Sequence, residues 1–250
     1  MKKIFLFLLA FVCFLSFACG DDQGDTPGGD TPGGDTPGGD TPGGETQEKD
    51  YFEVSELKGE LEKLIAAYCD SLNGNVVVDL VKGEESKKVE LIYNFADKQN
   101  VESLKYAITG VVNSHVYVKD SVIYMLSHET KSQENLTTSS SNLLIEKYGV
   151  KALLEQTLVF YTEDAFYQAL SFVEFKDGVA KYSLDLTKYL GTTVNASGKE
   201  SVDLYVSYVD KAITAVEFVA VADLTSKVKV QFLGLEKAKI TYPNDLNTYE

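Results

Sequence analysis

The chain of 250 residues contains no tryptophan and no arginine, so that all 23 of its cationic side chains are lysines. Without arginine it lacks the planar guanidinium that holds a phosphate group through two parallel hydrogen bonds. Its 38 acidic residues outnumber the lysines and give a net charge of −15, whereas nucleic-acid binding rests on clustered cations. We therefore expect no nucleic-acid partner.

Residues typical of metal sites or of catalysis are also scarce. The chain has two histidines, His115 and His128, and neither begins a spacing typical of metal ligands. The pattern Ser-x-x-Lys occurs at Ser55 and at Ser226 in unrelated contexts, and neither a Gly-x-Ser-x-Gly elbow nor an acidic calcium loop is present. The sequence predicts no catalytic residue, no metal site and no cofactor, and we expect the protein not to be an enzyme.

The longest apolar run, residues 4–17, is too short for a membrane-spanning helix, which takes about 20 residues. It follows Lys2 and Lys3 and ends before the small residue Ala18. A charged start, a short apolar stretch and a small residue at the end are typical of a secretory signal peptide. We therefore predict a signal peptide over residues 1–18 and an extracytoplasmic location.

Cys19 follows directly and is succeeded by a glycine and two aspartates. This arrangement resembles a bacterial lipobox, although Ser16 stands where that motif usually has Leu, Val or Ile. In a lipobox the cysteine thiol receives a lipid with acyl chains such as palmitate and becomes the new N-terminus. The resemblance implies lipid attachment at Cys19 and a membrane, at the cell surface, as a partner. The alternative is an ordinary cleaved signal with an incidental cysteine.

Residues 25–44 repeat Asp-Thr-Pro-Gly-Gly four times. Because the repeat has no apolar side chain, it cannot recover the entropy lost on ordering. Its glycines loosen the chain, while its prolines and charges extend it. The sequence predicts a disordered tether over residues 19–50, followed by one domain over residues 51–250, which carries 20 lysines and 29 acidic residues.

Helical and strand periods alternate along this domain. Apolar side chains three and four residues apart predict an amphipathic helix over residues 52–72, and the same spacing recurs at 142–158 and 162–172. Elsewhere the period is two, with a tight hairpin turn at residues 119–121, while the polar residues 127–142 are expected to interrupt the sheet. The predicted strands are 75–81, 88–96, 103–109, 115–126 (the hairpin), 171–175, 179–186, 201–209, 213–222, 226–234 and 238–242.

This order predicts an α+β fold. Neighbouring strands with short turns form a curved antiparallel sheet, a half-barrel, of about 8–11 strands with one polar face. Three or so helices cover the apolar, concave face. Few helices on so wide a surface tend to leave a ligand-sized apolar cavity. We expect its lining to come from Leu61, Leu64, Tyr68, Leu91, Tyr93, Leu204, Val206, Val228, Val230 and Phe232.

The helix-first order, the hairpin "VYVKDSVIY" at 116–124, the central helices and the closing "AKITYPNDLNTY" resemble the LolA/LppX-type half-barrel lipoproteins. Several members of that group carry acyl chains or lipids between an open half-barrel and a helical lid. The resemblance implies a similar cavity here. The group has no catalytic residues that could be carried over.

Two functions remain open from the sequence. The first is a membrane-anchored, non-enzymatic lipoprotein that binds a lipid or another hydrophobic ligand. The second is a structural or adhesive surface lipoprotein that recognises a protein or glycan through its outer face. The sequence indicates neither the ligand nor the oligomeric state. For the second function we expect Tyr117, Tyr189 and Tyr205 to be exposed, and we place Tyr93, Tyr208 and Tyr242 on the apolar face.

Overall fold

The computed structural model describes residues 49–110, 113–127, 129–158, 160–190, 202–220 and 226–250. The predicted signal peptide, Cys19 and the tether as far as residue 48 lie outside the described residues, as does His128. From Asp50 onward the described chain forms one compact unit. Among the described residues no helix is both long enough and apolar enough to cross a membrane.

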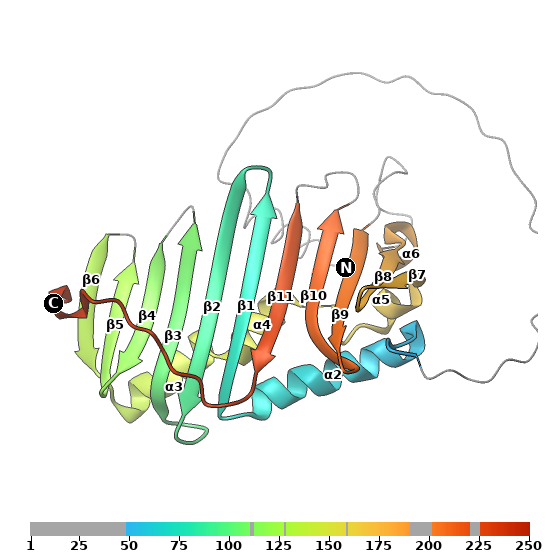
Figure 1. Cartoon of the computed structure of the whole chain (residues 1–250). Helices are drawn as coiled ribbons and strands as arrows, with labels where there is room; N and C mark the ends of the chain where they lie inside the picture. Colours follow the sequence, from blue (N-terminus) through green and yellow to red (C-terminus); the bar gives the residue numbers. More distant parts are fainter. Residues whose placement is uncertain (1–48, 111–112, 128, 159, 191–201, 221–225) are drawn as a thin grey trace, which may run out of the picture. The chain divides into compact units, whose positions relative to one another are not determined.

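Eleven strands within the described residues form one antiparallel sheet (Figure 1). The strands are β1 (Asn73–Lys82), β2 (Glu85–Phe95), β3 (Val101–Gly110), β4 (Ser114–Lys119), β5 (Val122–Ser127), β6 (Thr130–Asn135), β7 (Leu170–Lys176), β8 (Val179–Leu184), β9 (Val202–Val209), β10 (Ala212–Ala220) and β11 (Lys227–Gly234).

The sheet consists of two meanders joined at one pair of strands. Its order is β6-β5-β4-β3-β2-β1-β11-β10-β9-β8-β7, so β1 pairs with β11 at the centre and β6 and β7 are the two edges. Short hairpin turns connect β1 to β2, β4 to β5, β7 to β8 and β9 to β10; at Asp120 and Ser121 both φ angles are positive, which is the geometry of a tight two-residue turn. The sheet is open and not closed into a barrel, as the sequence predicted.

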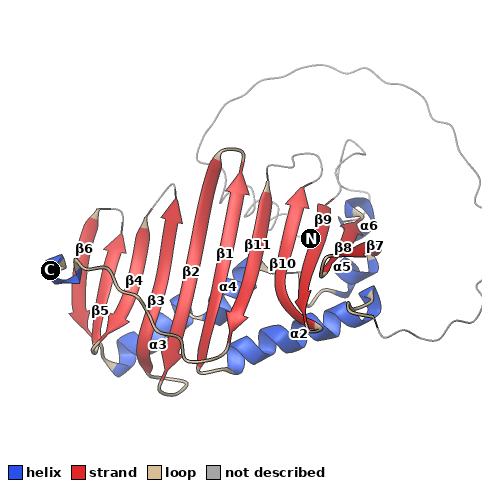
Figure 2. Cartoon of the chain, in the orientation of Figure 1, coloured by secondary structure: helices blue, strands red, loops and turns tan. Residues whose placement is uncertain are grey.

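The helices lie on one face of this sheet, behind it in Figure 2, and we call this the inner face. They cover it with their apolar sides, as expected for an α+β fold. Within the described residues the helices are α2 (Val54–Asp70), α3 (Thr138–Tyr148), α4 (Val150–Thr157), α5 (Asp164–Gln168) and α6 (Leu186–Leu190), together with the 3-10 turn η1 (Leu246–Thr248).

Helix α2 forms where the sequence predicted an amphipathic helix. A capping box between Glu53 and Glu56 satisfies N–H groups at its start. One side of the helix is buried against the sheet, at Leu57, Leu61, Ile65 and Tyr68. These intervals of four, four and three residues place the four side chains on one helical face, so the same pattern that predicts the helix also determines which side it buries.

The two faces of the sheet differ in chemistry. Alternation along β1 and β2 turns Val76, Val78, Leu91 and Tyr93 toward the helices, and all four are completely buried. On the other, outer face the charged residues of neighbouring strands stand opposite one another in the register. One such row is Lys88, Asp79, Lys229 and Glu217.

The C-terminal segment, residues 235–250, crosses the outer face, in front of the sheet in Figure 1. Asn94 on β2 donates to the Ala238 carbonyl oxygen over 3.0 Å, and the Tyr242 hydroxyl donates to the Val118 carbonyl oxygen over 2.8 Å. Toward the end of the chain, apolar side chains of the segment pack on β4 and β5. This outer cluster consists of Tyr117, Tyr124, Leu126, Tyr242, Leu246 and Tyr249.

Three predictions about the elements were wrong. Residues 130–135, expected within a polar break, form the edge strand β6, whose side chains are largely exposed and polar, as is common at the edge of a sheet. Residues 238–242, expected to be a strand, run without pairing across the outer face, and their alternation reflects burial of one side. The predicted strand 179–186 ends at Leu184, because Asp185 accepts from the Lys188 N–H over 2.9 Å and begins α6.

Candidate functional site

Aromatic side chains fill the centre of the inner face and attach α2 to the sheet. The Tyr93 hydroxyl of β2 donates to the Tyr68 carbonyl oxygen over 2.7 Å. The Tyr68 hydroxyl accepts from the Gly234 N–H over 2.8 Å, and its ring lies 5.1 Å from the Phe232 ring. Burial raises the pKa of both phenols. These contacts fix the C-terminal end of α2 against β2 and β11.

A second aromatic cluster lies where α5 packs on β10. The Phe160 ring is 4.3 Å from the Phe166 ring and 4.5 Å from the Phe218 ring. Tyr189 of α6 approaches Phe166 edge-on at 5.6 Å, and its hydroxyl donates to Glu163 over 2.8 Å. Burial, and then the bond to Glu163, raises the pKa of Tyr189. Contacts between aromatic rings thus hold the short helices α5 and α6 in place.

A third group of rings surrounds the start of the domain. The Tyr182 hydroxyl of β8 donates to the Phe52 carbonyl oxygen over 2.6 Å and lies 3.3 Å from the Tyr208 hydroxyl of β9. The Tyr51 ring stacks on the Phe172 ring of β7 at 4.6 Å. The chain therefore enters the domain against β7, β8 and β9, on the inner face.

The ten residues predicted to line a cavity are all found at this interior. Three belong to α2, and the other seven lie on the inner face of β2, β9 and β11. Nine of the ten are buried and Leu64 is half-buried. Their placement on one apolar face is therefore as predicted, whereas an enclosed cavity between them stays a prediction.

Apolar exposure on the inner face occurs at the end of the sheet that carries the β1–β2 hairpin. Leu80, Ile108 and Phe218 are half-buried there, and we call these three residues the rim. Leu80 is opposite Val228 in the register, and Val228 is opposite Phe218, so the rim continues across β11. The helices thus cover the rim less completely than the centre of the inner face. The period of two in the sequence predicted that these side chains face inward, but it did not indicate how far along the strands the helices cover the sheet.

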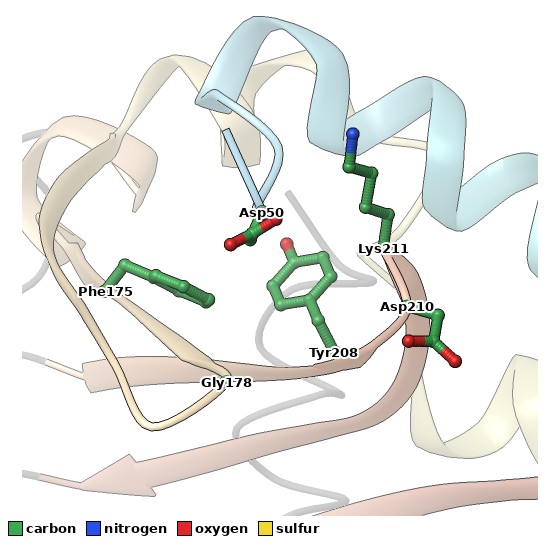
Figure 3. Close-up of a pocket in the computed structure, with 6 residues that line it drawn as sticks. All are labelled: Asp50, Phe175, Gly178, Tyr208, Asp210 and Lys211. Carbon is green, nitrogen blue, oxygen red and sulfur yellow. The ribbon is translucent and has the colours of Figure 1, made fainter. Parts of the chain in front are cut away.

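An open pocket of about 540 Å³ lies where the start of the domain passes the β7–β8 and β9–β10 turns (Figure 3). The carboxylate of Asp50 lies between the rings of Phe175 and Tyr208, whereas Asp210 points away from them. None of the ten predicted cavity residues lines this pocket. Its lining residues are Asp50, Phe175, Gly178, Tyr208, Asp210 and Lys211.

The described residues include two with potentially reactive side chains, Cys69 and His115, and both are packed within the fold. Within the described ranges no group of three or more His, Cys, Asp or Glu could hold a metal ion. Cys69, in the last turn of α2, is a half-buried free thiol whose pKa is raised by burial, the reverse of what a nucleophilic thiolate requires. His115 of β4 has its ring 5.7 Å from the Tyr117 ring, and burial lowers its pKa.

The tyrosines considered for surface recognition are less exposed than predicted. Tyr117 is buried beneath the C-terminal segment, and burial raises its pKa to about 12. Tyr189 and Tyr205 are half-buried. Tyr242 was assigned to the apolar inner face, but it lies in the outer cluster. The assignments of Tyr117 and Tyr242 were wrong because the sequence pattern does not show that the C-terminal segment folds back over the outer face.

No protein-family model matches the chain, and no curated protein sequence matches it. Solved structures that match the chain at low similarity include LprF from Mycobacterium bovis, with 15% sequence identity over 76% of this chain and 97% of that one, at a TM-score of 0.36. The lipoprotein LppX of Mycobacterium tuberculosis shares 12% identity over 71% and 93% of the two chains, with a TM-score of 0.31.

A LolA-superfamily protein from Nitrosomonas europaea shares 10% identity over 74% of this chain and 94% of that one, with a TM-score of 0.21. All three likenesses are distant, and they assign neither a family nor a ligand to this chain.

Proposed function

We propose that this chain is a membrane-anchored extracytoplasmic lipoprotein, not an enzyme, that binds a lipid or another hydrophobic ligand between the half-barrel and its helices. The observation that supports it most is the rim, because Leu80, Ile108 and Phe218 continue the apolar inner face to a place where the helices leave it half-exposed. Covering apolar surface contributes about 25 cal/mol for each Å² removed from water. An apolar ligand that enters at the rim would gain this free energy.

The ligand can be tested with a Cys19→Ala chain, so that no anchor lipid is mistaken for a bound one. We expect a fluorescent acyl probe to bind this protein, and solvent extraction of the purified protein to release acyl chains. Ile108→Asn should weaken probe binding by about tenfold, since it places an amide at the half-exposed apolar surface. Thr109→Asn is the matched control, because Thr109 is the next residue, exposed on the outer face. A folded protein that binds no probe would refute the proposal.

The anchor needs a separate test. Cells that produce the chain are grown with labelled palmitate, and the protein is isolated from the membrane fraction. We expect label in the natural chain and none in the Cys19→Ala variant, which should also leave the membrane fraction. Equal labelling of the two chains would show that Cys19 is not the attachment site.

The second candidate is a surface module that recognises a protein or glycan. The pocket of Figure 3 favours it, because it holds aromatic rings beside a carboxylate. The rings can stack on a sugar ring, and the carboxylate can accept hydrogen bonds from the sugar hydroxyl groups. Burial of Tyr117 and partial burial of Tyr189 and Tyr205 count against a tyrosine-rich outer surface. Glycan-array binding that is lost in Phe175→Ala, with acyl-probe binding absent, would favour this function over the first.

A further inference from the structure

The end of the C-terminal segment lies over a row of side chains that begins with a histidine. His115 of β4 stands opposite Leu126 of β5, and Leu126 stands opposite Lys131 of β6. The Lys131 ammonium lies 2.6 Å from a carboxylate oxygen of Asp245 and 5.2 Å from the centre of the Tyr249 ring. The last residues of the chain are therefore held directly above this row of the outer face.

The imidazole of His115 is packed in a way that suits its neutral form. His115 precedes Tyr117 by two residues and so shares its face of the strand. The two rings are 5.7 Å apart, and the Nδ1 atom of His115 is shielded from water. Tyr117 itself is buried beneath the segment. A positive charge on an imidazole in this position would lose much of its hydration.

Ionisable side chains from the neighbouring elements lie on the outer face around this ring. Glu90 pairs with Lys105 over 2.7 Å. Asp245 pairs with Lys131 over 2.6 Å. Protonation of His115 would thus add a third cation to two existing pairs. The groups concerned are Glu90 of β2, Lys105 of β3, Tyr117 of β4, Tyr124 of β5, Lys131 of β6, and Asp245 and Tyr249 of the segment.

These surroundings link the histidine to the position of the segment. Burial, and then the charge of Lys105, lowers the pKa of His115, while the Ser114 backbone and Asp245 act in the opposite direction. On an uncovered sheet face the ring would meet water and regain a pKa near its ordinary value of about 6.5. A lowered pKa in the covered state stabilises that state at neutral pH, and the contribution is lost as the pH falls through that lowered pKa.

We infer that the end of the C-terminal segment, residues 243–250, is an acid-sensitive cover, which detaches from β4, β5 and β6 when His115 takes up a proton. Detachment exposes the apolar side chains of Tyr117, Tyr124 and Leu126 in the outer cluster. The bonds of Asn94 to the Ala238 carbonyl oxygen and of Tyr242 to Val118 hold the earlier part of the segment in place. The change is therefore local to one end of the sheet.

Amide hydrogen exchange of the full-length Cys19→Ala chain tests this cover. The reporter is the Gln133 N–H, which donates to the Glu250 carbonyl oxygen over 2.9 Å. Its protection factor, which removes the pH dependence of exchange itself, should fall between about pH 7 and about pH 5. The fall should be no steeper than about tenfold per pH unit, because one proton is taken up. The Leu91 amide, in the centre of the sheet, should keep its protection throughout.

Variants then assign the proton. His115→Gln and His115→Phe should both abolish this fall, whereas His128→Gln, which removes the other histidine of the chain, should match the parent. A fall that persists in both His115 variants, or that disappears in His128→Gln, would overturn the inference. A simultaneous loss of protection at Leu91 would also overturn it, because the whole domain would then be unfolding.

A second measurement needs no substitution at His115. The imidazole protons of His115 are followed by NMR as the pH is varied, in the full-length chain and in a chain that ends at Tyr242. Because the shortened chain lacks the cover, the pKa of His115 should be closer to its ordinary value there. An identical pKa in the two chains would show that residues 243–250 do not shield the ring, and the inference would be wrong.

Discussion

The two faces of the central strands show how one alternating sequence supports two kinds of surface. On the inner face one register row consists of valines, and none of them has any exposed surface. One residue further along each strand, the outer face carries a row of opposite charges. The inner row is Val78, Val230 and Val216; the outer row is Asp79, Lys229 and Glu217.

This difference indicates which contacts contribute most of the free energy of folding. Burying a side chain such as valine contributes about 1.5–3 kcal/mol, whereas an exposed ion pair contributes about 0–1 kcal/mol. Lys229 is 4.0 Å from Glu217, and Gln231 donates to Asp79 over 2.8 Å. The outer contacts therefore mainly specify the register, because a shift by one residue would turn the charges inward.

The largest expected effect comes from substitutions at two neighbouring residues of β2, one on each face of the sheet. Leu91→Ala should lower the free energy of unfolding by about 2–5 kcal/mol, because Leu91 is completely buried on the inner face. Glu90→Ala, on the outer face, removes a 2.7 Å contact with Lys105 and should cost about 1 kcal/mol or less. Urea denaturation of the two variants measures both values. Equal losses would show that the faces do not differ in this way.

A glycine pair gives an intermediate effect. Gly74 of β1 is buried, and a Cβ atom there would lie 2.6 Å from Cζ of Tyr93, whose hydroxyl bonds to Tyr68. Gly74→Ala should displace this ring and lower the free energy of unfolding by about 1–3 kcal/mol. Gly59 of α2 has open space around the same position, so Gly59→Ala should raise stability by about 1 kcal/mol. Thermal denaturation compares the two variants; stabilisation by Gly74→Ala would mean that the ring moves at no cost.

The smallest effect concerns the C-terminal segment. The ammonium of Lys131, 2.6 Å away, lowers the pKa of Asp245 below its ordinary value. A carboxyl whose pKa is lower in the folded state stabilises that state at neutral pH, and this contribution is lost as the pH falls through the folded-state pKa. The Gln133 N–H, which donates to the Glu250 carbonyl oxygen over 2.9 Å, should therefore exchange faster in Asp245→Asn than in the parent at neutral pH.

The exchange difference also has a pH control. Below the folded-state pKa of Asp245 the parent and Asp245→Asn should exchange alike, because the side chain at position 245 is then uncharged in both proteins. The Leu91 amide, in the centre of the sheet, should not differ between the two proteins at either pH. A difference that persists in acid would mean that the ion pair does not hold the segment.

The sequence predicts the inner face well because burial on one side of a strand produces a period of two. Val76, Val78 and Leu80 share a face for this reason, and the structure places them together. The same rule failed for residues 238–242, where one-sided burial occurs without pairing. It also failed for β6, which pairs without one-sided burial. Alternation reports which side of a chain is buried, and strand pairing is a separate property.

The candidate site is harder to predict than the sheet. The ten residues predicted to line a cavity were chosen by period alone, and they lie on one apolar interior, while the cavity itself stays a prediction. The position of the rim depends on where α2 and the short helices end relative to the strands, which is set by contacts such as Phe160 on Phe218.

The pairing of β1 with β11 has a consequence for how the domain folds. All other pairings join strands that are neighbours in sequence, so each meander can assemble from contacts that are local along the chain. The seam between the two meanders closes only when residues 227–234 reach β1. Until then β1 presents an unpaired valine-rich edge, the kind of surface that promotes aggregation. The centre of the finished sheet is thus exposed for longest during folding, and substitutions along this seam should lower the yield of folded protein.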